Sequence, residues 1–130
     1  MKAAQKNPII IISGPAGVGK TTVAKALQRD YSNLETSVTY TTRQPRLEAP
    51  EDKKIYYITI PEFEKMIVQD EFLEWAKVHG QYYGTHKNKT LEKLKNHPVI
   101  FNLDVQGAKQ IMEKITDHPL VSIFLVPESI

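Results

Sequence analysis

The sequence predicts an α/β fold, in which a core built on a parallel sheet is interrupted by an inserted mixed α+β segment. Three observations lead to this prediction. The four isoleucines Ile9–Ile12 precede a glycine-rich loop and a helical pattern. A strand pattern followed by a helical pattern returns after His97-Pro98. The residues between do not continue that alternation, because they contain short strand candidates and a polar loop.

Size and composition fit a soluble protein of one modest domain. The chain has 130 residues, a net charge of +2 and no cysteine. The charge is too small to favour duplex nucleic acid or an anionic membrane as a partner. The lack of cysteine excludes disulfides and thiolate metal sites. The first eight residues hold no apolar run of signal-peptide length, so we expect a cytoplasmic protein that is neither exported nor inserted in a membrane.

The first core elements are a buried strand and the helix that follows it. A continuous β-branched run such as Ile9–Ile12 is typical of a strand buried on both faces, as in a parallel sheet. The helix is predicted to end near Asp30. Its inward side chains are predicted to be Val23, Ala24, Ala26 and Leu27.

The inserted segment is predicted to contain several short elements. The strand candidates are Thr36–Thr42, Ile55–Ile58 and Phe72–Val78, with a polar loop at 43–54. Thr59-Ile60-Pro61-Glu62 resembles a capping box that opens a helix. Gly80–Gly84 is predicted as a turn and Thr85–Asn96 as a helix.

The core pattern then returns. Val99–Leu103 is predicted as a strand that ends at Asp104, and Gln106–Ile115 as an amphipathic helix. Leu120–Val126 is predicted as a third buried strand. We therefore expect residues 1–34 and 98–130 to form the core and residues 35–97 to form the inserted domain.

The loop Gly14–Thr21 matches the phosphate-binding pattern G-x-x-x-x-G-K-[ST] at every fixed position. Its glycines let backbone N–H groups face an anion, and the next helix points its positive dipole end the same way. Lys20 can reach the β- and γ-phosphates, and Thr21 can place its hydroxyl on Mg²⁺. We expect ATP with Mg²⁺, bound by Gly14, Pro15, Ala16, Gly17, Val18, Gly19, Lys20, Thr21 and Thr22. The loop alone does not separate kinases from GTPases, motors or transporters.

A second anion site is predicted in the insert. Arg43 and Arg46 flank Gln44-Pro45, whose proline stiffens their separation, so both can fork onto one phosphate. Tyr56 and Tyr83 can each donate a phenolic hydrogen bond to that phosphate. The alternative is that the arginines are ordinary surface residues of a loop.

Two carboxylates are candidates for a base site. Glu74 lies on an apolar stretch, and Asp104 follows a core strand at the end where α/β proteins place ligand groups. A carboxylate only accepts hydrogen bonds, so it suits the N1–H and N2–H₂ edge of guanine and mismatches adenine. Thr39 can donate to guanine O6. The alternative for Glu74 is a solvated strand face.

Five blocks of the sequence together resemble guanylate kinase, in that family's order and near its spacing. The resemblance covers essentially the whole chain. The blocks are Ser13–Thr21, Thr41–Arg46, Glu71–Ala76, Tyr82–Thr85 and Asp104–Ala108.

The resemblance implies transfer of the ATP γ-phosphate to GMP with Mg²⁺, on a P-loop core with an inserted GMP-binding domain. In such enzymes the residues matching Arg43, Arg46, Tyr56 and Tyr83 bind the GMP phosphate. Those matching Thr39, Glu74 and Thr85 contact or frame guanine. The residue matching Asp104 lies between the ATP site and the GMP site and helps to organise them. The catalytic residues are therefore expected to be Lys20 at the ATP phosphates, Arg43 at the GMP phosphate, and Asp104 between them.

This chain departs from the family pattern in three places. The family glutamate that follows the second arginine is replaced by either Glu48 or Glu51, and Asn102 stands where an acidic residue is usual. The chain also ends at Ile130, so the family's lid and C-terminal helices are expected to be absent, with weak turnover and self-association through an exposed core. The alternatives are a non-catalytic guanylate-kinase-like binding module and another nucleoside monophosphate kinase.

Overall fold

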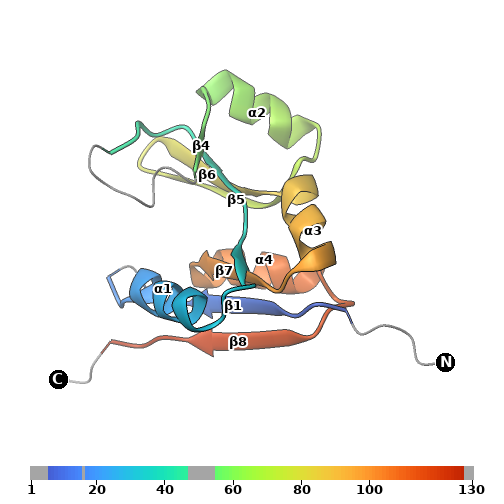
Figure 1. The fold of residues 1–130 in the computed structure, drawn as a ribbon. Coiled ribbons are helices and arrows are strands. Elements are labelled where there is room, and N and C mark those ends of the chain that lie inside the picture. The colour runs from blue at the N-terminus through green and yellow to red at the C-terminus, as the bar shows by residue number, and fades with distance from the viewer. Residues whose placement is uncertain (1–5, 16, 47–54, 128–130) are drawn as a thin grey trace. The chain divides into compact units, whose positions relative to one another are not determined.

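The protein is described here by a computed structural model that covers residues 6–15, 17–46 and 55–127 (Figure 1). Contacts divide the chain into two compact units. The first comprises Met1–Thr36 with Leu91–Ile130, and the second comprises Ser37–Thr90. None of the helices in the described part of the chain is long and apolar enough to cross a membrane.

The first unit is built on a four-stranded parallel sheet in the order β2-β7-β1-β8 (Figure 1). The central strand β1 pairs with β7 and β8 in parallel register, with Ile9 opposite Val99 and Leu120. The strand bounds are β1 Ile9–Ser13, β2 Glu35–Thr36, β7 Val99–Leu103 and β8 Leu120–Phe124. The predicted α/β class with a parallel core sheet is therefore confirmed.

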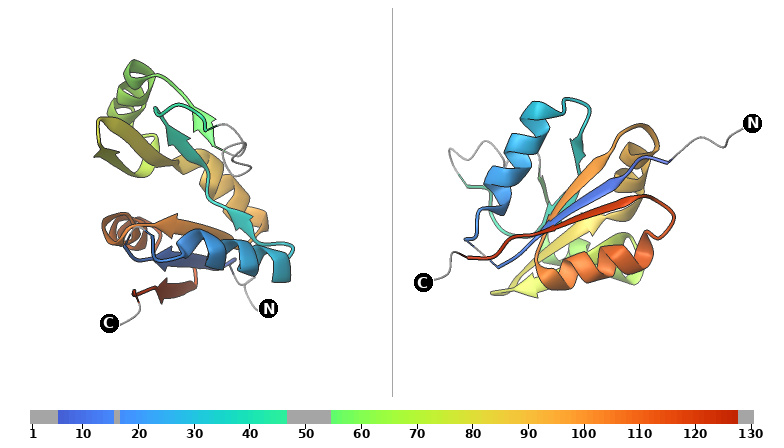
Figure 2. Two further views of the ribbon diagram at one scale, coloured as in Figure 1. Left: turned by 90° about the vertical axis from the view of Figure 1, so that its left-hand side faces the viewer. Right: turned by 90° about the horizontal axis from the view of Figure 1, so that it is seen from below.

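Helices α1 (Lys20–Asp30) and α4 (Val105–Lys114) lie on opposite faces of this sheet (Figure 2). On one face, Ala24 of α1 packs in a buried cluster with Ile12, Leu34 and Ile100. On the other face, Ile9 and Ile11 of β1 and Val99 and Phe101 of β7 are fully buried, and α4 buries Ala108 and Ile111. Successive isoleucines of β1 face opposite sides of the sheet, and both sides are covered. This explains why the apolar run is continuous.

The second unit contains a mixed four-stranded sheet in the order β4-β3-β6-β5. Strand β4 is parallel to β3, whereas β6 is antiparallel to both β3 and β5. One face is covered by α2, whose buried Phe63 packs with Tyr40, Phe72 and Tyr82. The elements are β3 Thr39–Thr41, β4 Tyr56–Tyr57, α2 Ile60–Val68, β5 Phe72–Val78 and β6 Gln81–His86. Helix α3 (Lys87–Asn96) begins in this unit and ends in the first.

The predicted capping box at the start of α2 is confirmed. The Thr59 hydroxyl accepts a hydrogen bond from the Glu62 backbone N–H at 3.2 Å, and the Glu62 carboxylate accepts one from the Thr59 N–H at 3.0 Å. These two bonds satisfy donors that a helix start otherwise leaves exposed.

The predicted turn at Gly80–Gly84 is wrong, because Gln81–His86 forms strand β6. The turn is confined to His79 and Gly80, which take positive φ values of 51° and 80°. The predicted helix start at Thr85 is wrong for the same reason, since α3 begins at Lys87. Pairing of β6 with strands on both sides overrides the local turn signal of the two glycines.

Two further strand predictions are corrected. The expected single strand Thr36–Thr42 is divided between β2 and β3, which belong to different sheets. Strand β8 was expected to be buried, yet Leu120, Val121 and Phe124 are all exposed, Phe124 by 57%. Within the described residues β8 has a neighbouring strand on one side only, namely β1.

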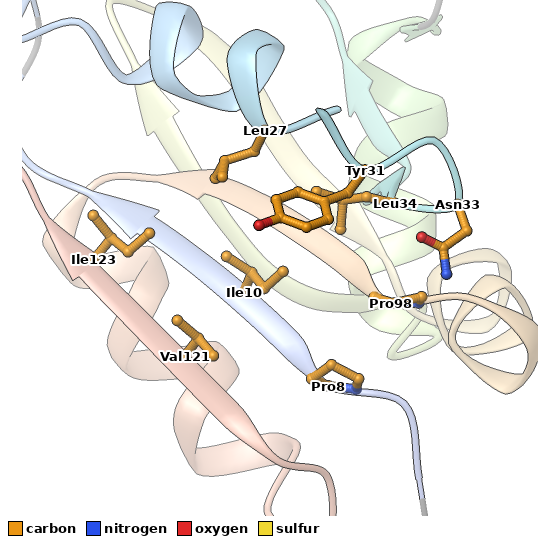
Figure 3. Close-up of a pocket in the computed structure, with 9 residues that line it drawn as sticks. All are labelled: Pro8, Ile10, Leu27, Tyr31, Asn33, Leu34, Pro98, Val121 and Ile123. Atoms are coloured by element: carbon orange, nitrogen blue, oxygen red, sulfur yellow. The ribbon is translucent and has the colours of Figure 1, made fainter. Parts of the chain in front are cut away.

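An apolar hollow of about 230 Å³ opens on the α1 face of the first unit (Figure 3). Leu27 and Tyr31 reach over it from the end of α1, and Val121 and Ile123 line it from β8 (Figure 3). Its lining offers no charged side chain, so it is unsuited to phosphate groups. The full lining is Pro8, Ile10, Leu27, Tyr31, Asn33, Leu34, Pro98, Val121 and Ile123.

Candidate functional site

The loop after β1 has the backbone shape that anion binding requires. Gly19 stands at the N-cap of α1 with φ 99° and ψ 21°, and no side chain caps the helix there. The first-turn N–H groups of α1 are therefore available to an anion, and the helix dipole favours one. Gly14, with φ 149°, admits no side chain, because an added Cβ would lie 2.5 Å from the Leu125 carbonyl oxygen.

Lys20 is held within the loop itself. Its Nζ donates a hydrogen bond to the Gly14 carbonyl oxygen at 2.7 Å, and the contact is partly buried. Thr21 and Thr22 follow on the exposed first turn of α1. The loop residues Pro15 and Gly17 are also exposed and Val18 is half-buried, whereas Ala16 lies outside the described residues.

The Thr21 hydroxyl contacts a residue of the neighbouring strand. The Asn102 side-chain Nδ2 donates a hydrogen bond to Thr21 Oγ1 at 3.3 Å. Asn102 pairs with Ile12 in the sheet, so the end of β7 lies beside the end of β1. This contact brings the residue that departs from the family pattern against the hydroxyl expected to meet Mg²⁺.

Asp104 begins the helix that follows β7. It is the N-cap of α4, and its Oδ1 accepts a hydrogen bond from the Gly107 backbone N–H at 2.7 Å. Its side chain is exposed. Sequence reasoning placed Asp104 correctly after the strand, and it missed the capping bond, for which the Asp-x-x-Gly spacing was a signal.

In the second unit, sheet register brings most of the expected acceptor residues to one face. Thr39 pairs with Thr85, and Thr85 also pairs with Glu74 on the other side. Tyr83, two residues before Thr85 on β6, pairs with Thr41 and shares that face. Because side chains alternate along a strand, these residues point the same way, away from the α2 face that carries Tyr40 and Phe72.

Glu74 and Thr85 form a buried pair. The Thr85 hydroxyl donates to Glu74 Oε2 at 2.7 Å, and the two residues are 9% and 2% exposed. An irregularity in register between Phe72 and Glu74 turns the carboxylate to this face. The alternative of a solvated strand face for Glu74 is therefore wrong, since its carboxylate is built into the sheet.

Arg43 is fixed at several points next to this face. Its backbone N–H donates to Thr41 Oγ1 at 3.3 Å, and its Nη1 donates to the Gln44 carbonyl oxygen at 2.9 Å. Its guanidinium carbon lies 5.6 Å from the centre of the Tyr57 ring. Arg46 is exposed, and the two acids considered for the family glutamate, Glu48 and Glu51, lie outside the described residues.

Tyr56 is not brought together with the other expected phosphate ligands. It pairs with Tyr40, so its side chain lies on the α2 face. Its ring stacks on Tyr40 with centroids 4.8 Å apart, and the Lys89 ammonium lies 4.0 Å from its centre. A hydrogen bond with Tyr40 and the nearby tyrosines raise the pKa of Lys89, which keeps the ammonium charged. The next residue, Tyr57, lies on the face that carries Tyr83, Thr85 and Glu74, called the acceptor face below. In the sequence, only the alternation of side chains along a strand could have indicated this position.

The family model for guanylate kinase matches residues 5–130. The chain is 41% identical to the guanylate kinase of Caldanaerobacter subterraneus subsp. tengcongensis, with 99% of this chain and 62% of the relative aligned. It is 43% identical to that of Clostridium acetobutylicum, over 96% and 59% of the two chains. For Rickettsia felis the identity is 44%, over 100% and 67%.

A solved structure gives the same result. The crystal structure of guanylate kinase from Anaplasma phagocytophilum superimposes with a TM-score of 0.75 at 31% sequence identity. The match covers 96% of this chain and 63% of that chain. The present chain thus spans about six-tenths of the length of the relatives it matches.

Proposed function

Because the chain belongs to the guanylate kinase family, we propose that it binds ATP and GMP for transfer of the ATP γ-phosphate to GMP. In this reaction the bond between the γ-phosphorus and the bridging oxygen of ADP breaks. A new bond forms from a phosphate oxygen of GMP to the same phosphorus, which gives ADP and GDP. We assign the donor to the first unit and the acceptor to the second.

The buried carboxylate Glu74 is the observation that supports GMP as acceptor. A carboxylate withdrawn from water needs donors, and Thr85 supplies one of them. The guanine edge offers two more, N1–H and N2–H₂, whereas adenine offers an acceptor at N1. Thr39 is paired with Thr85 and can donate from the same face to guanine O6. Glu74, Thr85 and Thr39 therefore form the proposed base site.

The phosphate of GMP is proposed to bind Arg43 and Arg46, with Tyr83 as a further donor. The phosphates of ATP and GMP repel each other because both are negatively charged. Two guanidinium groups would neutralise part of that charge. Phosphoryl transfer depends mainly on such neutralisation and on in-line positioning, so a side-chain nucleophile is not needed.

The donor ATP is proposed to bind the loop Gly14–Thr21. Lys20 would exchange its bond to the Gly14 carbonyl oxygen for the β- and γ-phosphate oxygens. The N–H groups at the start of α1 would meet the same phosphates. Asp104 is proposed to act near the transferred group through its carboxylate, and its capping bond to Gly107 fixes that carboxylate in place.

Mg²⁺ fits the donor set of this loop as a companion of ATP. Within the described residues there is no cluster of three or more acidic, histidine or cysteine side chains that would hold a metal by itself. The exposed Thr21 hydroxyl, together with phosphate oxygens and water, supplies the all-oxygen environment that Mg²⁺ prefers. When bound, the ion would neutralise charge on the β- and γ-phosphates.

The proposal is tested by calorimetric titration of this chain with GMP, AMP, CMP and dTMP. We expect GMP to bind and the other three to bind at least tenfold more weakly, because one mispaired buried charge costs about 1.5–3 kcal/mol. Comparable binding of AMP or dTMP would defeat the guanine assignment. A separate titration with Mg²⁺-ATP tests the donor site, and its failure would favour a non-catalytic binding module.

Glu74→Gln is the matched variant for the base site. Glutamine keeps an acceptor for the Thr85 hydroxyl, so the sheet should stay folded. It loses the charge and turns a donor toward guanine, so GMP affinity should fall about 10- to 100-fold. An unchanged affinity would rule out this role for Glu74.

A further inference from the structure

We propose that Tyr57 is a positioning residue that holds the Arg43 guanidinium at the acceptor face. Its neighbour Tyr56, which sequence reasoning selected, does not take part. The inference rests on the proposed function, because it concerns the arginine assigned to the phosphate of GMP. Tyr57 acts through Arg43 and is not itself proposed to touch the phosphate.

Sheet register separates the two tyrosines. Thr41 pairs with both Tyr57 and Tyr83, so these three residues share the face that carries Glu74 and Thr85. Tyr56 is one residue earlier on the same strand and therefore faces the other way. A shift of one residue along β4 thus decides which tyrosine can reach Arg43.

The contact between Tyr57 and Arg43 has the geometry of a cation–π interaction. The guanidinium carbon lies 5.6 Å from the ring centre, within the distance at which the ring's electrons attract a cation. The Tyr57 side chain is half-buried and its hydroxyl oxygen is fully shielded from solvent. The ring is therefore a fixed platform, and it restricts a side chain that would otherwise sample many rotamers.

Two hydrogen bonds act on Arg43 together with the ring. The bond from Arg43 N–H to Thr41 Oγ1 fixes the backbone, and the bond from Nη1 to the Gln44 carbonyl uses one terminal nitrogen. The ring holds the plane of the guanidinium without using a hydrogen-bond donor. A guanidinium held in this way loses less side-chain freedom when it binds phosphate.

Tyr56 provides a matched control on the same strand. It has the same size and chemistry, but its ring lies on Tyr40 under the Lys89 ammonium. Removing it should disturb that stack without changing Arg43. The two tyrosines therefore predict opposite results for a phosphate-dependent measurement.

The test compares Tyr57→Leu, Tyr57→Phe and Tyr56→Leu in calorimetric titrations with GMP and with guanosine. We expect Tyr57→Leu to weaken GMP about 3- to 10-fold and to leave guanosine unchanged, because only GMP engages Arg43. Tyr57→Phe keeps the ring and should retain wild-type affinity for both. Tyr56→Leu should leave GMP affinity unaltered.

Several outcomes would overturn the inference. Unchanged GMP affinity in Tyr57→Leu, or an equal loss for GMP and guanosine, contradicts a role through Arg43. Loss of GMP affinity in Tyr56→Leu would return the role to Tyr56. If Glu74→Gln weakens GMP while Tyr57→Leu does not, the proposed function stands and the inference alone fails. Absence of GMP binding by the unaltered chain overturns both.

A second measurement needs no substitution. The ring current of Tyr57 should shift the side-chain proton signals of Arg43 upfield in the NMR spectrum of the unaltered chain. This remains decisive if Tyr57→Leu does not fold. Arg43 signals at the positions usual for a solvated arginine would contradict the contact.

Discussion

The two units present their candidate ligand groups in different ways. In the first unit the anion would meet backbone N–H groups of a glycine loop at the start of α1. In the second unit the ligand would meet side chains set on a sheet face, of which Glu74 and Thr85 are already joined. A backbone site depends on conformation at a few glycines. A side-chain site depends on strand register and on the identity of each residue.

This difference explains how the groups are held before any ligand binds. Lys20 and Thr21 are held by weak or exchangeable contacts, with the Gly14 carbonyl at 2.7 Å and the Asn102 amide at 3.3 Å. Both contacts can give way to phosphate oxygens. Glu74 is instead held by the Thr85 hydroxyl within the sheet, in a buried contact. The loop is thus expected to rearrange on binding phosphate, whereas the proposed base site is expected to keep its Glu74–Thr85 bond.

The largest expected effect comes from Gly14, which tests the backbone side of this comparison. In Gly14→Ala the new Cβ would lie 2.5 Å from the Leu125 carbonyl oxygen and the residue would keep a strained φ of 149°. We expect a loss of about 3 kcal/mol or more in unfolding free energy. Gly17→Ala is the control, because nothing lies within 4 Å of its Cβ. Its unfolding free energy should fall by only about 1–2 kcal/mol, because alanine is strained at the Gly17 φ of 80°. Urea unfolding measures both, and equal losses would remove the proposed role of the Leu125 contact.

Asn102→Asp tests the side-chain part of the donor site. Aspartate would accept a hydrogen bond from the Thr21 hydroxyl, which leaves that oxygen's lone pairs to Mg²⁺, and it adds a negative charge. We expect affinity for ATP to rise by about fivefold with saturating Mg²⁺, a change on the order of 1 kcal/mol. Without Mg²⁺ the affinity should fall, because the new charge repels the phosphates. Titration of ATP with and without Mg²⁺ measures the two values, and the same sign in both conditions would contradict the assignment.

His86 offers a smaller test, because it stabilises the acceptor unit without lying on its ligand face. Burial lowers the pKa of His86, and the Lys89 charge acts in the same direction, although Glu71 opposes them. Its Nδ1 accepts a hydrogen bond from the Lys89 backbone N–H at 3.2 Å, so protonation there would break that bond at the start of α3. The unfolded chain then binds more protons than the folded one as the pH falls below the ordinary histidine range, and stability decreases with falling pH.

The measurement is the unfolding midpoint of the unaltered chain and of His86→Gln between about pH 7.5 and 5, across the ordinary histidine pKa near 6.5. Glutamine can still accept from the Lys89 N–H but does not titrate. We expect the variant to lose a part of the pH dependence that the wild type shows over this range. Parallel pH profiles would mean that His86 titrates equally in the folded and unfolded states, and this would contradict the lowered pKa.

The smallest expected effect concerns self-association, and it contrasts the apolar surfaces of the two sheets. Strand β8 of the first sheet exposes the side chains of Val121 and Phe124, whereas the apolar face of the second sheet is covered by α2. We expect weak pairing of two copies along β8, because an exposed apolar edge strand is a template for another strand. Sedimentation velocity at increasing concentration should detect it, and Phe124→Lys should abolish it. A monomer at every concentration tested would contradict this prediction.

Local patterns were predictable from the sequence, and pairings between distant residues were not. The phosphate loop and the capping box at Thr59 are each contiguous, so their residue types reveal them directly. The face on which Tyr56 lies depends on which residue of β3 it pairs with, and no local pattern fixes that register. The pairing of Glu74 with Thr85 depends in addition on the irregularity after Phe72.

Glycine was the residue most easily misinterpreted. Gly80 and Gly84 together suggested a turn, and only Gly80 has a positive φ. Gly84 lies within β6, where an added Cβ would come 2.8 Å from the Phe72 ring and 2.9 Å from the Phe63 ring. It is glycine because two aromatic rings pack against the strand at that point. A sequence contains no mark that separates a glycine needed for conformation from one needed for space.

The contact between Gly14 and Leu125 also has a consequence for the order of folding. The phosphate loop is contiguous in the sequence, but it is closed by a residue from near the far end of the chain, whose N–H donates to the Ser13 carbonyl at 2.8 Å. Closing so long a stretch of chain is slow relative to forming a local turn. During synthesis the loop therefore leaves the ribosome early, and it acquires this closing contact only after β8 has followed it. A motif that is contiguous in the sequence thus depends on a contact with a residue far along the chain.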